Sequence, residues 1–188
     1  MILILSILLL LATPAHAIII IGGTGAAPDP PPGYCTTQST DVSLTVNNAT
    51  SIFYSDQDRG QSWESGVTGS LYSIQLRKNA DLTAATLTLR IGVSSNLSTT
   101  YLSEFTCTVP YAAGVFECVI PQDDRPSLTS GTTYYLLMRT SGGAGDGWVI
   151  NRDSTGGYAN GTAYYDITKD WVGTVATSDL YFITRMCD

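Results

Sequence analysis

Short runs in which apolar and polar residues alternate recur along most of the chain. In the clearest run, residues 87–93, four aliphatic side chains alternate with polar ones. A period of two is typical of an antiparallel strand with one buried face. By this pattern we expect strands at 42–46, 52–54, 72–76, 87–93, 105–109, 133–139, 148–152 and 180–184.

Turn-forming residues separate these runs and indicate an all-β fold. Gly, Pro, Asn and Asp gather at 79–81, 121–126, 142–147 and 154–157. Apolar residues nowhere keep a helical period for three turns, so we expect a helical turn or two at most. Residues 18–188 are enough for one domain with a core and too few for two, and we expect that domain, a jelly-roll β-sandwich, at 35–188.

The N-terminus indicates export. Residues 1–12 are almost purely apolar, and Ala15-His16-Ala17 follows them, which predicts a signal peptide cleaved after Ala17. The first 28 residues lack a charged side chain, and four isoleucines at 18–21 extend the apolar stretch. An uncleaved membrane anchor that ends near Ala27 is therefore the alternative. Residues 18–34 continue as a Gly- and Pro-rich arm or linker.

Composition and charge limit the classes of partner that we expect for this protein. The chain is 13% charged and contains 18 Gly and 11 Tyr, a balance that favours strands and tight turns. Its net charge is −7, and its nine Lys and Arg residues are scattered. Nucleic acid and anionic membrane surfaces are therefore excluded as expected partners, because phosphate binding needs clustered positive charge.

Four cysteines fit two disulfides formed in an oxidising compartment. Three pairings are possible. Cys107 and Cys118 lie on two strand-like runs around a turn at 111–114, so we expect a bridge across a β-hairpin. The remaining bridge would then join Cys35 to Cys187, the first and last parts of the domain.

Several framework residues recur in an order typical of one group of domains. They are Gln61-Ser62-Trp63 opening a strand, Gly69-x-Leu71, residues 130–135 starting a long strand, Trp148, residues 158–161, Trp171 and residues 179–182. In this framework the chain resembles the exported lectin-like, carbohydrate-binding-module-like jelly-roll domains of bacterial surface and secreted proteins. The resemblance implies a non-catalytic binding or structural module, although fold does not fix function.

Catalytic groups are scarce. The single histidine, His16, lies in the segment expected to be cleaved, so the mature chain lacks the usual general base. A glycosidase needs two carboxylates, either about 5 Å or 6.5–9.5 Å apart. On the expected hairpin, Glu104 and Glu117 would be roughly 13 Å apart at about 3.3 Å per residue. A pair that uses Glu64 or an aspartate stays open, but we expect no enzyme.

The richest candidate ligand site lies at 142–161, where two Gly-rich loops flank a short strand. Aromatic rings and polar groups suited to a sugar occur there together. The candidates are Asp146, Trp148, Asn151, Arg152, Asp153 and Tyr158. In the alternative interpretation Trp148 belongs to the core, and Asp146 and Asp153 form turns. Trp63 and Trp171 are expected to be framework aromatics.

No cofactor is expected, with one exception. Lectin-like sandwiches often bind structural calcium through loop carboxylates, and Asp56, Asp58 and Asp179 are the acids suited to it, although no EF-hand spacing is present. Zinc is not expected, because Cys-x-x-Cys spacing is missing.

Two functions follow as hypotheses. The first is a secreted or surface-attached module that binds a carbohydrate or another extracellular ligand. The second is a subunit of an extracellular fibre, a homopolymer in which the arm at 18–27 completes the sheet of a neighbouring copy. The second hypothesis rests on the exposed isoleucine run beside the Gly/Pro arm.

Overall fold

A computed structural model describes residues 35–54, 57–79, 85–141, 147–166 and 170–187. The predicted signal peptide and most of the arm lie outside these residues. The described chain consists of fourteen strands and one short 3-10 helix, Gln122–Asp124. The strands are β1 (Gln38–Leu44), β2 (Ala49–Tyr54), β3 (Asp58–Glu64), β4 (Gly69–Lys78), β5 (Ala85–Gly92), β6 (Ser103–Val109), β7 (Gly114–Val119), β8 (Ser127–Leu128), β9 (Thr133–Ser141), β10 (Gly147–Asp153), β11 (Ala163–Asp166), β12 (Thr174–Val175), β13 (Asp179–Leu180) and β14 (Phe182–Cys187).

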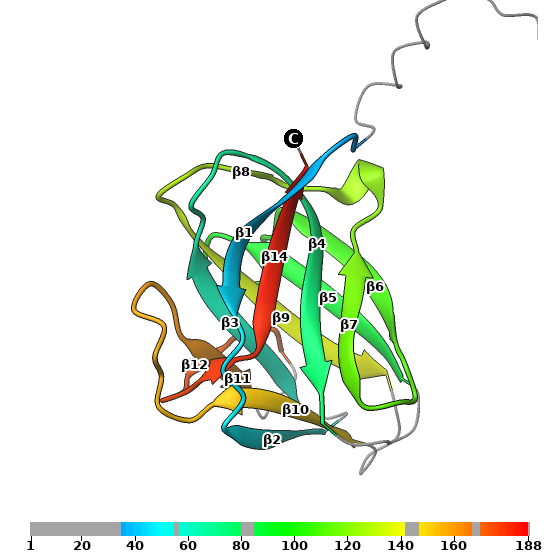
Figure 1. Ribbon diagram of the computed structural model, residues 1–188, viewed down its shortest axis with the longest axis vertical. Coiled ribbons are helices and arrows are strands. Elements are labelled where there is room, and N and C mark those ends of the chain that lie inside the picture. The colour runs from blue at the N-terminus through cyan, green and yellow to red at the C-terminus, as the bar shows by residue number, and fades with distance from the viewer. Residues whose placement is uncertain (1–34, 55–56, 80–84, 142–146, 167–169, 188) are drawn as a thin grey trace, which may run out of the picture. The chain divides into compact units, whose positions relative to one another are not determined.

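The strands form two antiparallel sheets that pack face to face. Sheet A has the order β1-β14-β4-β10-β13, with β2 on β10 and with β7 and β8 on β4; sheet B has the order β12-β11-β3-β9-β5-β6. Figure 1 shows β1, β14, β4 and β7 in front of β3, β9, β5 and β6. The predicted all-β sandwich is confirmed, whereas the jelly-roll connection stays a prediction.

The core lies between the sheets and follows the predicted alternation. Leu87, Leu89 and Ile91 of β5 are fully buried, as their pattern indicates. Val93 is an exception, because it lies beyond the end of β5 and is 58% exposed. Trp63 is fully buried, with its ring centroid 5.5 Å from that of Phe182 on the opposite sheet. Trp63 is thus a framework aromatic, as expected.

Strand β3 begins earlier than its framework residues predicted. The sequence placed Gln61-Ser62-Trp63 at the opening of a strand, but these residues lie near the end of β3. The strand pairs with β9 on one side and with β11 on the other, so it is central in sheet B. Gly60 is required at its position, because a Cβ atom there would lie 2.0 Å from the carbonyl oxygen of Leu136.

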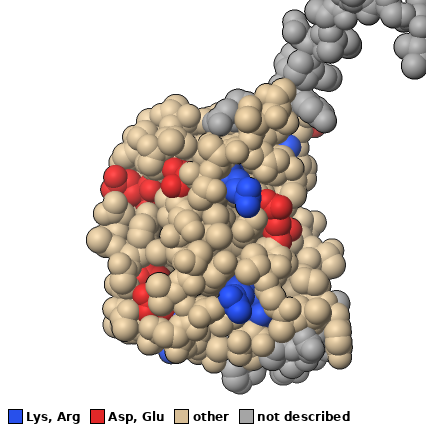
Figure 2. All heavy atoms as spheres, in the orientation of Figure 1, with Lys and Arg blue, Asp and Glu red and all other residues tan. Residues whose placement is uncertain are grey.

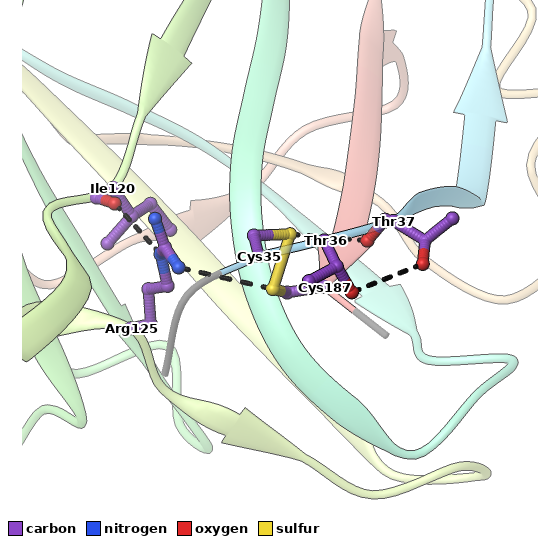
Figure 3. Close-up of a disulfide and its surroundings, with 6 residues drawn as sticks. All are labelled: Cys35, Thr36, Thr37, Ile120, Arg125 and Cys187. Carbon is purple, nitrogen blue, oxygen red and sulfur yellow. Dashed lines mark hydrogen bonds between the residues drawn. A yellow bond between two sulfur atoms is a disulfide. The ribbon is translucent and has the colours of Figure 1, made fainter. Parts of the chain in front are cut away.

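Both predicted disulfides are present, Cys35–Cys187 and Cys107–Cys118, and they use all four cysteines. Cys35 precedes β1, and β1 pairs along β14, so the first bridge joins the beginning and the end of the described chain (Figure 3). Arg125 lies beside this bridge and donates a hydrogen bond to the carbonyl oxygen of Ile120 at 3.2 Å. Two disulfides fit an oxidising environment.

The predicted hairpin around the second bridge is wrong. Strand β6 pairs with β5 in sheet B, and β7 pairs with β4 in sheet A, so the turn between them crosses from one sheet to the other. Gly114, at φ 140°, lies where the chain enters β7. The buried faces of β6 and β7 oppose each other across the core, and Cys107–Cys118 therefore ties the two sheets together.

The outer face of sheet A carries few charges, and they are scattered. Glu117 of β7 accepts a hydrogen bond from Ser73 and lies 3.7 Å from Arg185 of β14. In Figure 2 the basic and acidic side chains of this face form small separate spots. None of the helices in the described part of the chain has the length and apolar character to cross a membrane.

The disulfide that joins the two sheets should contribute measurably to the free energy of unfolding. Replacing both of its cysteines, Cys107→Ala with Cys118→Ala, should lower the free energy of unfolding by about 3 kcal/mol. The reason is that the disulfide closes a loop and so reduces the conformational entropy of the unfolded chain. Urea unfolding at neutral pH measures the difference. An unchanged unfolding midpoint would show that packing alone holds the two sheets together.

Candidate functional site

Three of the four predicted ligand residues on β10 have described side chains, and these point to different sides of the strand. Asn151 and Asp153 are buried, and the amide of Asn151 donates to Asn79 Oδ1 at 3.5 Å. Arg152 lies between them in sequence, so its side chain leaves the opposite side of the strand. The structure therefore does not bring these three side chains into one site.

Asp153 organises a turn. Its carboxylate accepts hydrogen bonds from the backbone and hydroxyl of Thr155, from the Asn48 amide and from the backbone N–H of Gly157. The hydrogen bond from the Thr155 hydroxyl is the main cause that lowers the pKa of Asp153. Gly156 adopts φ 63° in the same turn. This arrangement matches the alternative in which Asp153 is a turn-former.

Among the remaining predicted ligand residues, the structure describes the side chain of Tyr158. Tyr158 is half-buried and packs against the core, and its backbone N–H donates to Asp179 Oδ2 at 3.0 Å. The backbone of Trp148 pairs with Phe53 of β2, and the side chain of Trp148 lies outside what the structure describes. Asp146 also lies outside the described residues.

A pocket opens between the sheets on the side of β10 that Arg152 faces. Its volume is about 440 Å³, and it is lined by Arg59, Arg152, Ala163 to Tyr165, residues 175–178 and Leu180. Strands β10, β11 and β12, which contribute to this lining, lie near one another in the lower part of Figure 1. The size falls within the range typical of small-molecule sites, about 300–1,000 Å³.

The walls of the pocket combine apolar, aromatic and polar groups. Ala163 and Leu180 are buried members of the core, so the floor of the pocket is apolar. Tyr165 is 38% exposed and presents its ring at the wall, and Thr177 and Ser178 add hydroxyl groups. Such a set can hold a molecule that has both an apolar face and hydrogen-bonding groups.

The two arginines reach the pocket from opposite sheets. Arg59 comes from β3; its guanidinium lies 5.7 Å from the centre of the Tyr165 ring and donates to Gln57 Oε1 at 2.8 Å. Arg152 comes from β10 and donates to the carbonyl oxygen of Thr50 at 3.2 Å. Burial lowers the pKa of Arg59; Tyr165 opposes that shift, and the charge of Arg152 adds to it.

Sequence reasoning found only Arg152 among the pocket residues. Arg59 lies in the polar run Asp58–Glu64, which has no apolar alternation, so nothing marked it as part of a strand. Tyr164 and Tyr165 do follow Ala163 in an aromatic run typical of strands. That run was the available signal for this side of the pocket.

Asp58 and Asp179, the two predicted calcium ligands that the structure describes, lie on different faces of sheet B. Asp58 accepts two hydrogen bonds from Arg139, each 2.8 Å long, on the outer face of sheet B. Asp179 accepts hydrogen bonds from Gln61 and from the backbone of Tyr158 between the sheets. Asp56 lies outside the described residues. Within the residues that the structure describes, no three His, Cys, Asp or Glu side chains gather to hold a metal.

Asp58 instead anchors a second cluster outside sheet B. The backbone N–H of Trp171, a residue at φ 67°, donates to Asp58 Oδ2 at 2.8 Å. The Trp171 ring packs with Leu97, Leu137 and Tyr164 in a cluster separate from the main core. The guanidinium carbons of Arg90 and Arg139 lie 4.3 and 4.0 Å from its centre. Trp171 is thus a framework aromatic.

The glutamates of the predicted hairpin lie on different sheets. Glu104 on β6 forms an ion pair with Arg90 on the outside of sheet B. Glu117 lies on the outside of sheet A with Ser73 and Arg185. The core separates the two carboxylates, so they do not form the pair that glycoside hydrolysis requires.

The Asp153 turn predicts a pH-dependent contribution to stability. The pKa of Asp153 is lower in the folded protein than in the unfolded chain, so its ionised carboxylate stabilises the fold above about pH 4. This stabilisation is lost as pH falls through the folded-state pKa. Asp153→Asn should therefore lower the melting temperature at pH 7 and match the unchanged protein at the lowest pH where both still fold. A deficit of equal size at every pH would contradict this account.

Asp58 is predicted to stabilise the fold without a metal. Asp58→Asn should lower the free energy of unfolding by about 3 kcal/mol, because it removes the buried negative charge that Arg139 faces in this ion pair. The exposed change Asp123→Asn is the control. Thermal melts with and without a chelator should show the same deficit for Asp58→Asn, whereas a deficit that disappears in chelator would identify Asp58 as a metal ligand.

The sequence was also compared with known proteins. Neither the family models nor the curated proteins contain a match to this chain.

Proposed function

We propose that this protein is an exported, non-catalytic binding module that holds a carbohydrate in the pocket between its sheets. The observation that carries the proposal is the pocket itself, where an apolar floor, an exposed aromatic ring and hydrogen-bonding groups face one opening. Fold alone would not support this function, since β-sandwiches serve many roles.

The chemistry of a sugar ring fits this lining. One face of a pyranose ring carries C–H groups and its edge carries hydroxyls, so recognition needs an apolar or aromatic surface beside fixed polar groups. Ala163, Leu180 and the ring of Tyr165 offer the first. The guanidinium groups of Arg59 and Arg152 offer donors that can bind hydroxyl oxygens.

Export and the lectin-like framework support the same proposal. Two disulfides fit an oxidising compartment, and a signal peptide is predicted before them. The resemblance to exported lectin-like domains points to binding of an extracellular ligand. The fibre hypothesis stays a prediction from the sequence, because the isoleucine run that motivates it lies outside the described residues.

Removal of the pocket aromatic tests the proposal. The purified protein should bind a subset of sugars on a glycan array, and Tyr165→Ala should weaken that binding by about tenfold or more, as expected for an aromatic anchor. Tyr111→Ala is the matched control, because Tyr111 is 66% exposed and lies outside the pocket. The melting temperature of each variant shows that its fold is intact.

Two results would overturn the proposal. One is an array on which the folded protein binds no glycan. The other is a glycan that binds Tyr165→Ala and the unchanged protein equally well, since its site would then lie elsewhere on the surface.

A further inference from the structure

Strand β6 is an open edge of sheet B. It pairs along its whole length with β5, and within the described chain no strand pairs with its other side. The backbone N–H and C=O groups on that side are therefore available to a further strand. Figure 1 shows β6 and β7 together at one flank of the sandwich.

The usual protection of an edge strand is missing from β6. Proteins protect such edges with bulges, very short strands, prolines or lysines. Elsewhere in this sandwich, the register of β1 is interrupted by a shift, and β12 and β13 are two residues long. Strand β6 has seven residues in an uninterrupted register, and its one charged side chain, Glu104, forms an ion pair with Arg90 of β5. The edge is thus regular, and its charge is balanced.

Exposed apolar side chains gather along the same flank. Of the eleven large hydrophobic residues that are exposed in the described chain, six lie on β7 or within two residues of an end of β5 or β6. They are Val93, Tyr101, Leu102, Tyr111, Val115 and Val119. Leu102, directly before β6, is 51% exposed. Apolar surface concentrated beside an open edge is typical of a place where another chain packs.

The flank is also held in place. The Cys107–Cys118 disulfide joins β6 to β7, with 5.3 Å between the two Cα atoms. Phe105 and Val109 of β6 are buried in the main core. An edge that is fixed before binding loses little conformational freedom when a strand is added, so more of the interaction energy appears as affinity.

The chain itself contains a segment suited to this edge. The isoleucine run at 18–21 has a high β propensity, and residues 18–27 carry no charge. Four prolines follow at 28–32. Pro-rich linkers favour an extended form of about 3.1 Å per residue, in which residues 22–34 would span about 40 Å. Such a linker directs the run away from its own domain and towards another copy.

We infer that β6 is an assembly edge, to which residues 18–21 of a neighbouring copy add as a further strand of sheet B. Main-chain hydrogen bonds to β6 hold the added strand, and its isoleucines pack against the apolar side chains of the flank. The donor and the acceptor lie on the same chain, so the contact repeats from copy to copy and builds an open filament. This inference names the acceptor for the fibre hypothesis and is independent of the pocket and its ligand.

Variants that block either side of the contact test the inference. N-terminal sequencing of the exported protein should give Ile18 first, and sedimentation velocity should show species that grow with protein concentration. Ile20→Asp in the donor and Thr108→Lys on the acceptor edge should each leave the protein monomeric, since charge at an edge opposes strand addition. Thr86→Lys is the matched control, because Thr86 is exposed opposite Thr108 but lies on β5, which has a strand on both sides.

A mixture of the two blocked variants gives the sharpest result. The Ile20→Asp protein keeps an intact edge, and the Thr108→Lys protein keeps an intact isoleucine run. Together they should form a one-to-one complex, although neither associates alone. A mixture that stays monomeric overturns the inference. Melting temperatures equal to that of the unchanged protein show that each variant is folded.

Other occupants of the edge, and other roles of the run, give different results. Association that survives Ile20→Asp but is lost in Thr108→Lys would assign the edge to β6 of a second copy. A chain that begins at Met1 and sediments with membranes would assign the isoleucine run to an anchor. An unchanged protein that is monomeric at every concentration would exclude assembly. Each of these results overturns the inference and leaves the proposal on carbohydrate binding untouched.

Discussion

The side-chain amide of Gln61 joins the two sheets where the packed core meets the open pocket. It accepts a hydrogen bond from the backbone of Leu180 at 2.8 Å and donates to the Asp179 carboxylate at 3.0 Å, so both ends of a fully buried amide are satisfied. An amide buried without such partners would oppose folding. The interaction fixes β3 of sheet B against β13 of sheet A, and the packing on either side depends on that register.

Successive side chains of β3 point to opposite faces of sheet B, and this alternation determines which residues lie on each face. On the inner face, Trp63 fills the core and Arg59 enters the pocket, two residues to either side of Gln61. On the outer face, Asp58 binds Arg139 and the backbone of Trp171. A shift of one residue would exchange these faces, so Gln61 would turn away from Asp179 and Asp58 would turn away from Arg139. The inter-sheet amide and the outer ion pair therefore specify the same register.

The sequence predicted the parts of the fold in which hydrophobicity alternates, and it failed where polar residues are buried. Strand β5 and both disulfides were predicted correctly. Strand β3 was only partly predicted, because its buried positions include Gln61 and Ser62, which are paired by hydrogen bonds that no local pattern shows. The pocket was missed for the same reason, since Arg59 lies on β3 and only Arg152 belonged to the predicted site. The hairpin error has another cause: alternation and a short turn are the same whether two strands pair in one sheet or face each other across a core.

Arg59 and Arg152 bring two positive charges to the lining of the pocket. Burial and the charge of Arg152 both disfavour a charged guanidinium at Arg59, and the ring of Tyr165 compensates only in part. Groups whose charge is disfavoured in the folded protein tend to gather at functional sites, where a ligand completes their environment.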